Sequence, residues 1–430
     1  MGGMLQTLKN AWNIKDLRKR IIFTILMLIV FRVGSFIPVP WINAEKFRSL
    51  IGAGGQLFGF LDIIAGGAFS NVTIFAMSIT PYINSSIIIQ LLTIAIPRLE
   101  KLAKEGEEGR KILAQYTRYG TVGLGFLQAT ALYLGMRSAV TPGSPVLSFM
   151  TITLTFTAGT AFLMWLGEQI TEYGIGNGIS MLIFAGIVSR GPQAVISLVR
   201  LYIGKAFGTG LISILAIIVI LAIFIFVMGA VIWVQEAERR IPIQYAKRVV
   251  GRKVYGGQNT HLPIKVNLAG VIPIIFAMSI MAFPSTIIGL VAPNSTSRIV
   301  LWIKNAQQGI PYAIMYALLI IFFTFFYTII QFNPIEIANN MKKNGGFIPG
   351  IRPGKPTSDY ISKVLNRITW FGAIFLAAIT LLPNLLGVVF KVQGIWFSGT
   401  AMLILVGVAM DTIKQIESQM LMRNYKGFLE

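Results

Sequence analysis

The chain has 430 residues, of which 55% are hydrophobic and only 12% are charged, and its mean hydropathy is +0.71. This composition excludes an ordinary soluble protein, because a water-exposed surface needs far more charge. The absence of cysteine excludes disulfides and thiolate chemistry, and the single histidine, His261, cannot form a metal cluster by itself.

Apolar blocks of about 17–25 residues, the helix length that crosses roughly 30 Å of hydrocarbon, predict ten membrane spans. In chain order, these spans cover residues 21–39, 72–96, 114–134, 151–167, 179–198, 212–235, 266–288, 308–330, 368–390 and 394–413. The basic N-terminal stretch before the first span shows no small-residue cleavage site, so we predict no removable signal peptide.

The distribution of basic residues predicts the orientation of the spans. A net charge of +21 suggests nucleic acid as a partner. However, the two termini and the loops after spans 2, 4, 6 and 8 together hold roughly threefold more lysine and arginine than the other loops. This bias is typical of cytoplasmic segments, so we expect both termini in the cytoplasm.

Ten spans divide into two halves of five, residues 1–205 and 206–430. An odd number of spans in each half forces the second half to insert upside down relative to the first, which is the topology of an inverted repeat. The sequence shows no obvious internal identity, so the repeat is an expectation from counting alone.

Two long loops, 235–265 and 331–367, follow spans 6 and 8 on the cytoplasmic side. Loops of this length are uncommon as plain connectors and are often functional. Their basic residues allow two interpretations, a topology signal with attraction to anionic lipid or a docking platform for an acidic partner such as RNA or a protein face. Their length favours docking, since a topology signal needs only a few residues.

A half-length apolar segment, LFGFLDIIAGGAFSN at 57–71, lies directly before span 2. It contains one carboxylate, Asp62, and a Gly-Gly pair near its end. The segment is too short to cross a bilayer, and a short apolar helix can lie at membrane depth only where protein surrounds it. A peripheral re-entrant or interfacial helix is the alternative.

Polar residues inside spans predict faces that avoid lipid. In span 2, Pro81 should kink or loosen the helix, and Asn84 follows within one turn. Gln128 in span 3 and Asn267 at the cytoplasmic end of span 7 are further polar positions. Such groups cost free energy in hydrocarbon unless they face protein or water, although ordinary interhelical hydrogen bonding is an alternative explanation for each.

Isoleucines recur at helical spacing in two spans, at Ile79 and Ile83 and at Ile183 and Ile187. An i, i+4 pair lies on one face of a helix. In membrane helices such pairs usually meet lipid, so the spacing alone assigns them no function.

Residue types and motifs that the sequence lacks disfavour several classes of function. None of the sixteen acidic residues lies in the middle of a span, which disfavours an ion- or proton-coupled transporter. The glycine-rich stretches GIGNG (174–178) and GIRPGKPT (350–357) lack the spacing of nucleotide-binding loops. No catalytic triad or metal constellation can be assembled in the spans. A protein-conducting channel is therefore favoured over a secondary transporter, and an enzyme of lipid-linked substrates ranks third.

Several long motifs occur in a fixed order between Ala11 and Met422. They are MSITPYINSSIIIQLLT (77–93), KEGEEGRKILAQYTRYGT (104–121), GEQITEYGIGNGIS (167–180), YAKRVVGRKVYGGQNTHLPIKVNLAGVIPIIFA (245–277), GGFIPGIRPGKPT (345–357) and LNRITWFGA (365–373). In these motifs the chain resembles the SecY family of bacterial protein-conducting channels.

The resemblance implies an all-α membrane protein with ten helices in two inverted five-helix halves around a central pore, and a short re-entrant plug helix at about 57–70. Unfolded preproteins would thread the pore, while signal peptides and membrane spans would leave sideways into membrane lipids between spans 2, 3, 7 and 8. The implied partners are SecE, SecG, the motor ATPase SecA and the ribosome, in the bacterial plasma membrane. The implied protein is not an enzyme and has no cofactor and no metal.

The resemblance also implies site residues in four groups. The pore ring comprises Ile79, Ile83, Ile183, Ile187, Ile275 and Ile404. The plug comprises Leu57, Phe58, Phe60, Leu61, Ile63, Ile64, Gly66 and Gly67. The polar candidates for the lateral gate are Asn84, Gln128 and Asn267, and the docking candidates are Arg252, Lys253 and Arg352. A ring of branched apolar side chains would seal around any polypeptide and dewet when empty.

Overall fold

The computed structural model describes residues 4–53, 62, 65–141, 143–193, 196, 199, 211–245, 248–250, 253–255, 259–291, 310–390 and 399–424. Contacts divide the chain into two compact units. Unit 1 comprises residues 1–213, 279–312 and 404–430, and unit 2 comprises residues 214–278 and 313–403.

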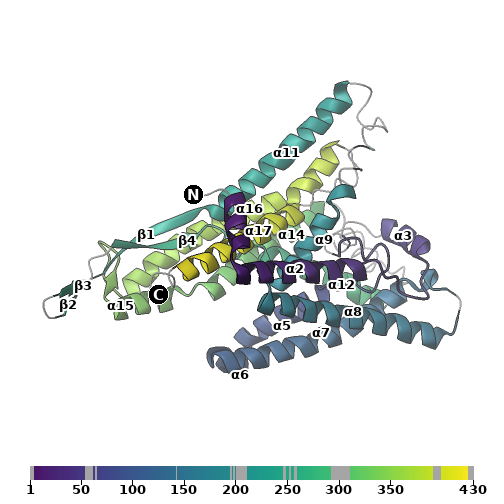
Figure 1. The fold of residues 1–430 in the computed structure, drawn as a ribbon, viewed down its shortest axis with the longest axis horizontal. Coiled ribbons are helices and arrows are strands. Elements are labelled where there is room, and N and C mark those ends of the chain that lie inside the picture. The colour runs from purple at the N-terminus through teal and green to yellow at the C-terminus, as the bar shows by residue number, and fades with distance from the viewer. Residues whose placement is uncertain are drawn as a thin grey trace. The chain divides into compact units, whose positions relative to one another are not determined.

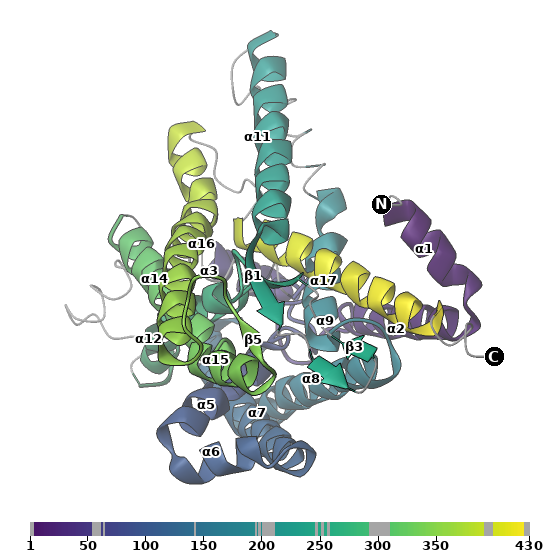
Figure 2. The same cartoon turned by 90° about the vertical axis from the view of Figure 1, so that its left-hand side faces the viewer.

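The N-terminal part of unit 1 is helical. Its elements are α1 (Met4–Asn13), α2 (Lys15–Gly34), α3 (Ala44–Ala53), α5 (Thr80–Ala95), α6 (Pro97–Lys104), α7 (Glu107–Gly135), the 3-10 helix η1 (Arg137–Ala139), α8 (Pro145–Tyr173) and α9 (Gly178–Ser189). Helix α7 packs against α5 and α8, and α8 also packs against α2 and α9. The turn between α5 and α6 bends the chain by 103° before Pro97, and α6 returns the chain to α7 (Figure 2).

Four further helices include residues of both units. They are α11 (Leu211–Glu236), α12 (Ile272–Val291), α14 (Ile310–Gln331) and α17 (Gly399–Asn424). The C-terminal part of α17 belongs to unit 1, where Ile416 packs with Ala11, Leu17 and Ile175 in one apolar cluster.

Unit 2 also contains α15 (Pro334–Lys343), α16 (Lys355–Phe390) and the strands of the structure. The strands are β1 (Glu238–Tyr245), β2 (Arg248–Val250), β3 (Lys253–Tyr255), β4 (Asn259–Lys265) and β5 (Gly346–Phe347). They form an antiparallel sheet with the order β4-β1-β5 and a separate β2–β3 hairpin. Figure 1 shows β1 and β4 side by side, with the hairpin beyond their end.

The sheet joins the two long loops, 235–265 and 331–367, that the charge distribution predicts on the cytoplasmic side. Strands β1 and β4 come from loop 235–265 and β5 comes from loop 331–367, with Gln244 opposite Phe347. Alternate residues of β1, Ile241 and Ile243, are buried. They share an apolar cluster with Ile264, Met341, Ile348, Ile361 and Leu365. The fold is mostly helical, as predicted, but these loops contain strands that the all-α prediction omitted.

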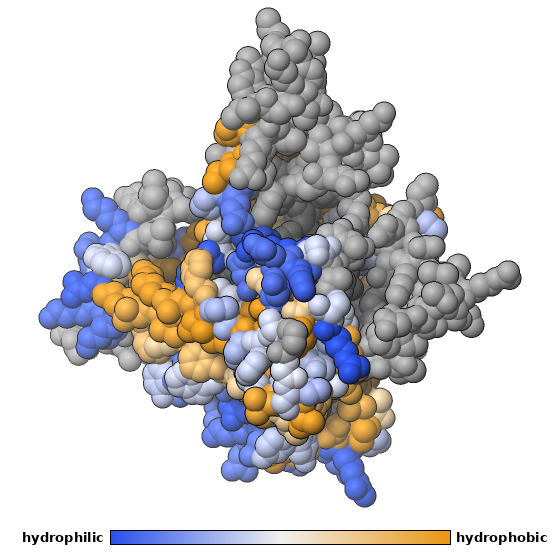
Figure 3. All heavy atoms as spheres, turned by 90° about the vertical axis from the view of Figure 1, so that its right-hand side faces the viewer, coloured by the Kyte–Doolittle hydropathy of each residue, from blue (hydrophilic) through white to orange (hydrophobic). Residues whose placement is uncertain are grey.

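A helix overlaps each of the ten predicted spans. Within the described ranges, four helical stretches are long and apolar enough to cross a membrane by length and composition, and the bent pair α5–α6 is a fifth candidate. Hydrophobic side chains also cover large areas of the face drawn in Figure 3. These observations confirm a mostly helical membrane protein.

Span 2 differs from its prediction at the N-terminal end. The helix begins at Thr80 rather than Val72, and residues 65–79 form successive turns. The predicted kink at Pro81 is wrong, because Pro81 lies in the first turn of α5. At that position its missing N–H would have no helical partner anyway and its fixed φ suits a helix start.

Candidate functional site

The segment 65–79 between α3 and α5 is packed inside unit 1 although it forms no helix. The Phe75 ring stacks on Phe31 of α2 and on Phe162 of α8, with centroid distances of 6.1 and 5.9 Å. The backbone pairs with the chain that follows α2, since Val39 N donates to Val72 O at 2.9 Å. These contacts place the segment against α2 and α8.

Close packing against α8 depends on a glycine. A Cβ at Gly159 would lie 2.0 Å from the carbonyl oxygen of Ile74. No side chain fits there, so this position of α8 allows direct contact with the backbone of the segment.

A buried ion pair fixes Asp62, which lies just before the segment. Asp62 pairs with Arg190, the residue that caps the C-terminus of α9, and the two side chains are only 9% and 13% exposed. The second interaction of the carboxylate is a hydrogen bond from the Ser70 backbone N–H at 2.8 Å. The Gly67 N–H donates to the Asp62 carbonyl at 2.9 Å. Both the carboxylate and the backbone carbonyl of Asp62 therefore have partners.

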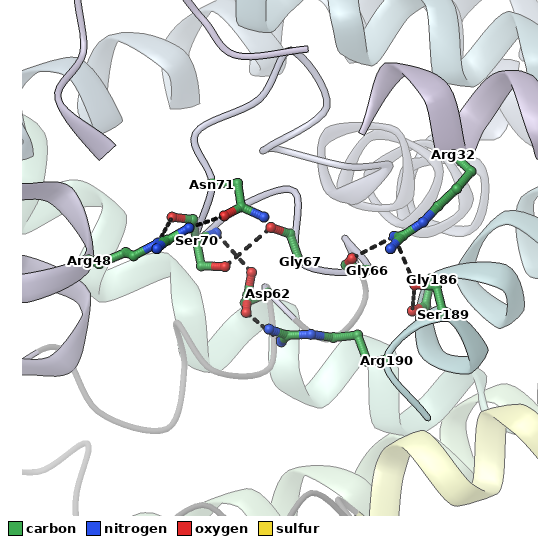
Figure 4. A network of polar contacts seen from close by, with 10 residues as sticks. All are labelled: Arg32, Arg48, Asp62, Gly66, Gly67, Ser70, Asn71, Gly186, Ser189 and Arg190. Atoms are coloured by element: carbon green, nitrogen blue, oxygen red, sulfur yellow. Dashed lines mark hydrogen bonds and ion pairs between the residues drawn. The ribbon is translucent and has the colours of Figure 1, made fainter. Parts of the chain in front are cut away.

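A second arginine holds the glycine pair of the segment. Arg32 of α2 donates from Nη1 to the Gly66 carbonyl at 2.9 Å and to Ser189 Oγ at 3.1 Å (Figure 4). Gly66 has a φ of +63°, and a Cβ there would lie 2.8 Å from Ser189 Oγ and 3.0 Å from Gly186 Cα. Only glycine combines this backbone conformation with so close an approach to α9.

One further arginine contacts the segment from an exposed position. Arg48 of α3 hydrogen-bonds to the Asn71 side chain and to the Ser70 carbonyl. Because this contact is exposed to solvent, we expect its loss to destabilise the segment much less than loss of the part-buried contacts of Arg32 or of the buried Asp62–Arg190 ion pair.

The predicted plug residues fall mostly outside the described residues. This applies to Leu57, Phe58, Phe60, Leu61, Ile63 and Ile64. Gly66 and Gly67 are described, and both have positive φ angles, +63° and +90°. The glycine pair therefore lies in the turns that precede α5.

The six predicted pore-ring residues are all described, in both units. Ile79, Ile183 and Ile404 are buried, while Ile83, Ile187 and Ile275 are partly buried. Ile275 belongs to unit 2 and the other five belong to unit 1. Ile79 and Ile83 lie one turn apart at the start of α5, with Ile83 N donating to Ile79 O at 3.0 Å. A ring of all six residues stays a prediction.

The predicted gate residues include side-chain amide atoms that have no hydrogen-bond partner among the described residues. Asn267 is 9% exposed, and neither of its amide atoms has a hydrogen-bond partner among the described residues. The same is true of Asn84 Oδ1, although Asn84 as a whole is only partly buried. Gln128 is partly buried on α7. A lateral gate at these residues stays a prediction.

Two of the three predicted docking residues, Lys253 and Arg352, lie in the described part of the chain. Arg252 lies outside the described residues, and Lys253 begins β3. Arg352 is exposed in the turn before α16, where its carbonyl accepts a 2.9 Å hydrogen bond from Thr357 Oγ1. Thr357 therefore braces this turn, and the Arg352 guanidinium makes no hydrogen bond to the described part of the chain.

The ion pair between Asp62 and Arg190 was not predicted from the sequence. The sequence does carry a signal for it, because Asp62 is a lone carboxylate in an apolar segment, and Arg32 and Arg190 are each the single charge inside a predicted span. Ionisable residues at membrane depth usually have a partner or a function. The sequence does not identify the partner, since Arg190 is 128 positions away.

Comparison with known proteins decides the family. A sequence profile of SecY matches residues 73–413, most of the chain. The chain belongs to the SecY family.

Two SecY relatives extend the match to the whole chain. The protein translocase subunit SecY of Halalkalibacterium halodurans is 48% identical over 439 residues, which cover 99% of this chain and 100% of the relative. The protein of the same name from Thermotoga maritima is also 48% identical and covers 99% and 98%. The predicted function of a pore-forming translocase subunit is therefore confirmed.

Solved SecY and Sec61 structures show the same fold. A protein-conducting channel superimposes with a TM-score of 0.66 at 20% identity, covering 93% of this chain and 92% of the other. A SecY structure whose plug domain is said to stabilise the closed state of the translocation channel gives 0.66 at 19% identity, with the same coverage. Sec61 in a canine ribosome–channel complex gives 0.61 at 19% identity, again with the same coverage.

Proposed function

We propose that this SecY-family chain is a passive channel in the bacterial plasma membrane that passes unfolded preproteins across and releases signal peptides and membrane spans sideways into lipid. Its ten spans form two inverted halves, 1–205 and 206–430, and both termini are cytoplasmic. The chain performs no catalysis, so the energy comes from a partner. The observation that carries this proposal is identity of 48% along the whole chain to a protein translocase subunit.

The segment 57–70 acts as the plug of this channel. Its described part is anchored to α2 and α9 by Arg32 and Arg190, and the chain that follows it packs against α8 through Phe75. Irregular backbone at membrane depth is tolerated only where protein surrounds it, which is the environment of residues 65–79. Displacement of the segment would open the pore to the passing chain.

The six pore-ring isoleucines form the constriction that closes around the polypeptide. Branched apolar side chains offer no hydrogen bond that would retain a particular sequence, and an empty apolar constriction excludes water. Helix α9 contributes Ile183 and Ile187 one turn apart, and Ile83 of α5 lies one turn after Ile79, the N-cap of that helix, which suits a constriction formed by helix faces.

The lateral gate uses the polar residues Asn84, Gln128 and Asn267. An unpartnered buried amide costs free energy in the closed gate. An apolar signal peptide that enters the seam would replace such unfavourable packing and shift the gate toward its open state.

The partners bind the cytoplasmic part of unit 2, where the two long loops share one sheet. Arg252, Lys253 and Arg352 contact the motor ATPase SecA or the ribosome. The exposed guanidinium of Arg352 on a braced turn suits such a contact. SecE and SecG complete the channel within the membrane.

Protease protection of a signal-bearing preprotein tests the proposed function. Proteoliposomes would hold this chain with SecE and SecG, with SecA added outside, with and without ATP. We expect protease-resistant preprotein only when ATP is present. Absence of protection from correctly inserted complexes would contradict the proposal and favour a small-solute transporter.

A further inference from the structure

We propose that Asp62, Arg190 and Arg32 form a latch that holds the plug in its closed position and releases it when the pore ring on α9 widens. This inference rests on the proposed plug function and adds the contacts that determine how easily the plug leaves. Figure 4 shows both arginines reaching the segment from different helices.

The first contact of the latch is the ion pair between Asp62 and Arg190. Both side chains are largely buried, so the closed state pays a desolvation cost that the pairing must offset. When the two groups separate into water, each regains its hydration. A buried pair of this kind has a modest net contribution when intact, but loss of either partner strongly destabilises the closed state.

The second contact of the latch is made by Arg32. Its guanidinium joins the Gly66 carbonyl of the segment to Ser189 Oγ of α9, and Ser189 Oγ in turn donates to the Gly186 carbonyl at 2.7 Å. The segment is therefore tied to α2 and α9 at once. A movement of α9 relative to α2 disturbs both contacts of the latch.

The segment also makes apolar ring contacts, in addition to the exposed contacts of Arg48 and the backbone hydrogen bonds with Ile37 and Val39. Phe69 packs edge-on against Phe47 at a centroid distance of 5.5 Å, and Phe75 stacks on Phe31. Apolar contacts are non-directional and tolerate sliding, whereas charge-assisted hydrogen bonds require one geometry. The latch therefore selects a single closed position from the positions that apolar packing would allow.

The position of Arg190 links the latch to the pore ring. Arg190 caps α9, and its N–H donates to the carbonyl of Ile187 at 3.2 Å. Ile187 and Ile183 are pore-ring residues on that helix, one and two turns before the cap. Because a helix moves as a stiff unit, outward displacement of these isoleucines by a polypeptide would draw Arg190 away from Asp62. Widening of the pore and release of the plug are then one event.

Resting ion conductance of the reconstituted complex with SecE and SecG tests the latch. We expect D62N and R190Q each to raise resting conductance at least about tenfold. The double variant should leak no more than the leakier single variant, because both changes break the same pair. R190K keeps the charge and should leak less than R190Q. In D62N, preproteins with defective signal sequences should also be transported more efficiently.

R48Q is the matched control, because Arg48 contacts the same segment from an exposed position. Its conductance should equal that of the unaltered chain. Deletion of 57–67 separates the two proposals. If the deletion leaks while D62N and R190Q do not, the latch is wrong and the plug stands. If the deletion does not leak, the plug function fails and the latch fails with it.

Discussion

The hydroxyl of Ser85 on α5 donates a 2.8 Å hydrogen bond to the carbonyl of Thr117 on α7. The two helices approach closely at this point, since Gly120 has no side chain. A Cβ there would lie only 2.3 Å from Ser85 Oγ. Both helices belong to the proposed lateral gate. The contact ties them into one rigid part of unit 1, so we expect the gate to open beside this helix pair rather than within it.

Substitution of Gly120 by alanine should separate α5 from α7. The added methyl group overpacks the contact with Ser85, and overpacking typically costs about 1–3 kcal/mol. Thermal unfolding of the purified complex would show a lowered midpoint. Gly123 on the same helix is the control, since a Cβ there has nothing within 4 Å. G123A should be neutral or stabilising, and an equal loss in both variants would contradict the account of this contact.

Substitution of Asn267 by leucine should stabilise the chain. Asn267 is buried, and its amide has no partner in the described part of the structure. Removing an unsatisfied buried polar group recovers about 1–3 kcal/mol of desolvation cost. The unfolding midpoint should rise, and span insertion should slow if the closed gate becomes more favourable. A lowered midpoint would mean that the amide has a partner in the assembled channel.

Much of the helical architecture could be predicted from the sequence. Each predicted span has a helix, because burial in lipid demands long apolar runs that are visible without any structure. The start of α5 was misjudged, since residues 72–79 are as apolar as a span but form turns. Their environment is protein rather than lipid, and composition does not distinguish the two.

The site was predictable only in part, for a similar reason. The glycine pair at 66–67 and the isolated charges of Arg32 and Asp62 stand out in the sequence. The pairing of Asp62 with Arg190 depends on how α9 packs, which is a tertiary contact without a local signal. The strands of the long loops were also missed, although β1 has an alternating pattern. Strand β1 pairs with β4 of its own loop and with β5 of the other loop, and the second pairing joins segments that are distant in the chain.

Replacement of both Ile183 and Ile187 by glycine should loosen the pore ring. The variant should export preproteins with defective signal sequences and show a higher resting ion leak, because a wider constriction dewets less readily. Val188 is an exposed neighbour on the same helix. V188G provides the control for loss of helix propensity, which costs about 1 kcal/mol. Unchanged leak and unchanged selectivity in the double variant would count against these ring positions.

Reversal of charge at Arg352 should lower the rate of SecA-driven transport at least about tenfold. A carboxylate in place of an interfacial cation would repel an acidic surface of the partner. The rate of ATP-dependent preprotein transport is the measurement. Lys363 is another exposed cation of unit 2, on α16, and K363E serves as the control for the change in net charge. Transport by R352E at the rate of K363E would show that Arg352 does not contact the motor.

Resting conductance of the 57–67 deletion in planar bilayers tests the central claim most directly, which is that a protein-conducting pore is closed by this segment. The complete channel with SecE and SecG should be nearly silent, and the deletion should conduct ions at rest. Equal conductance of the two channels, with equal assembly, would contradict the account.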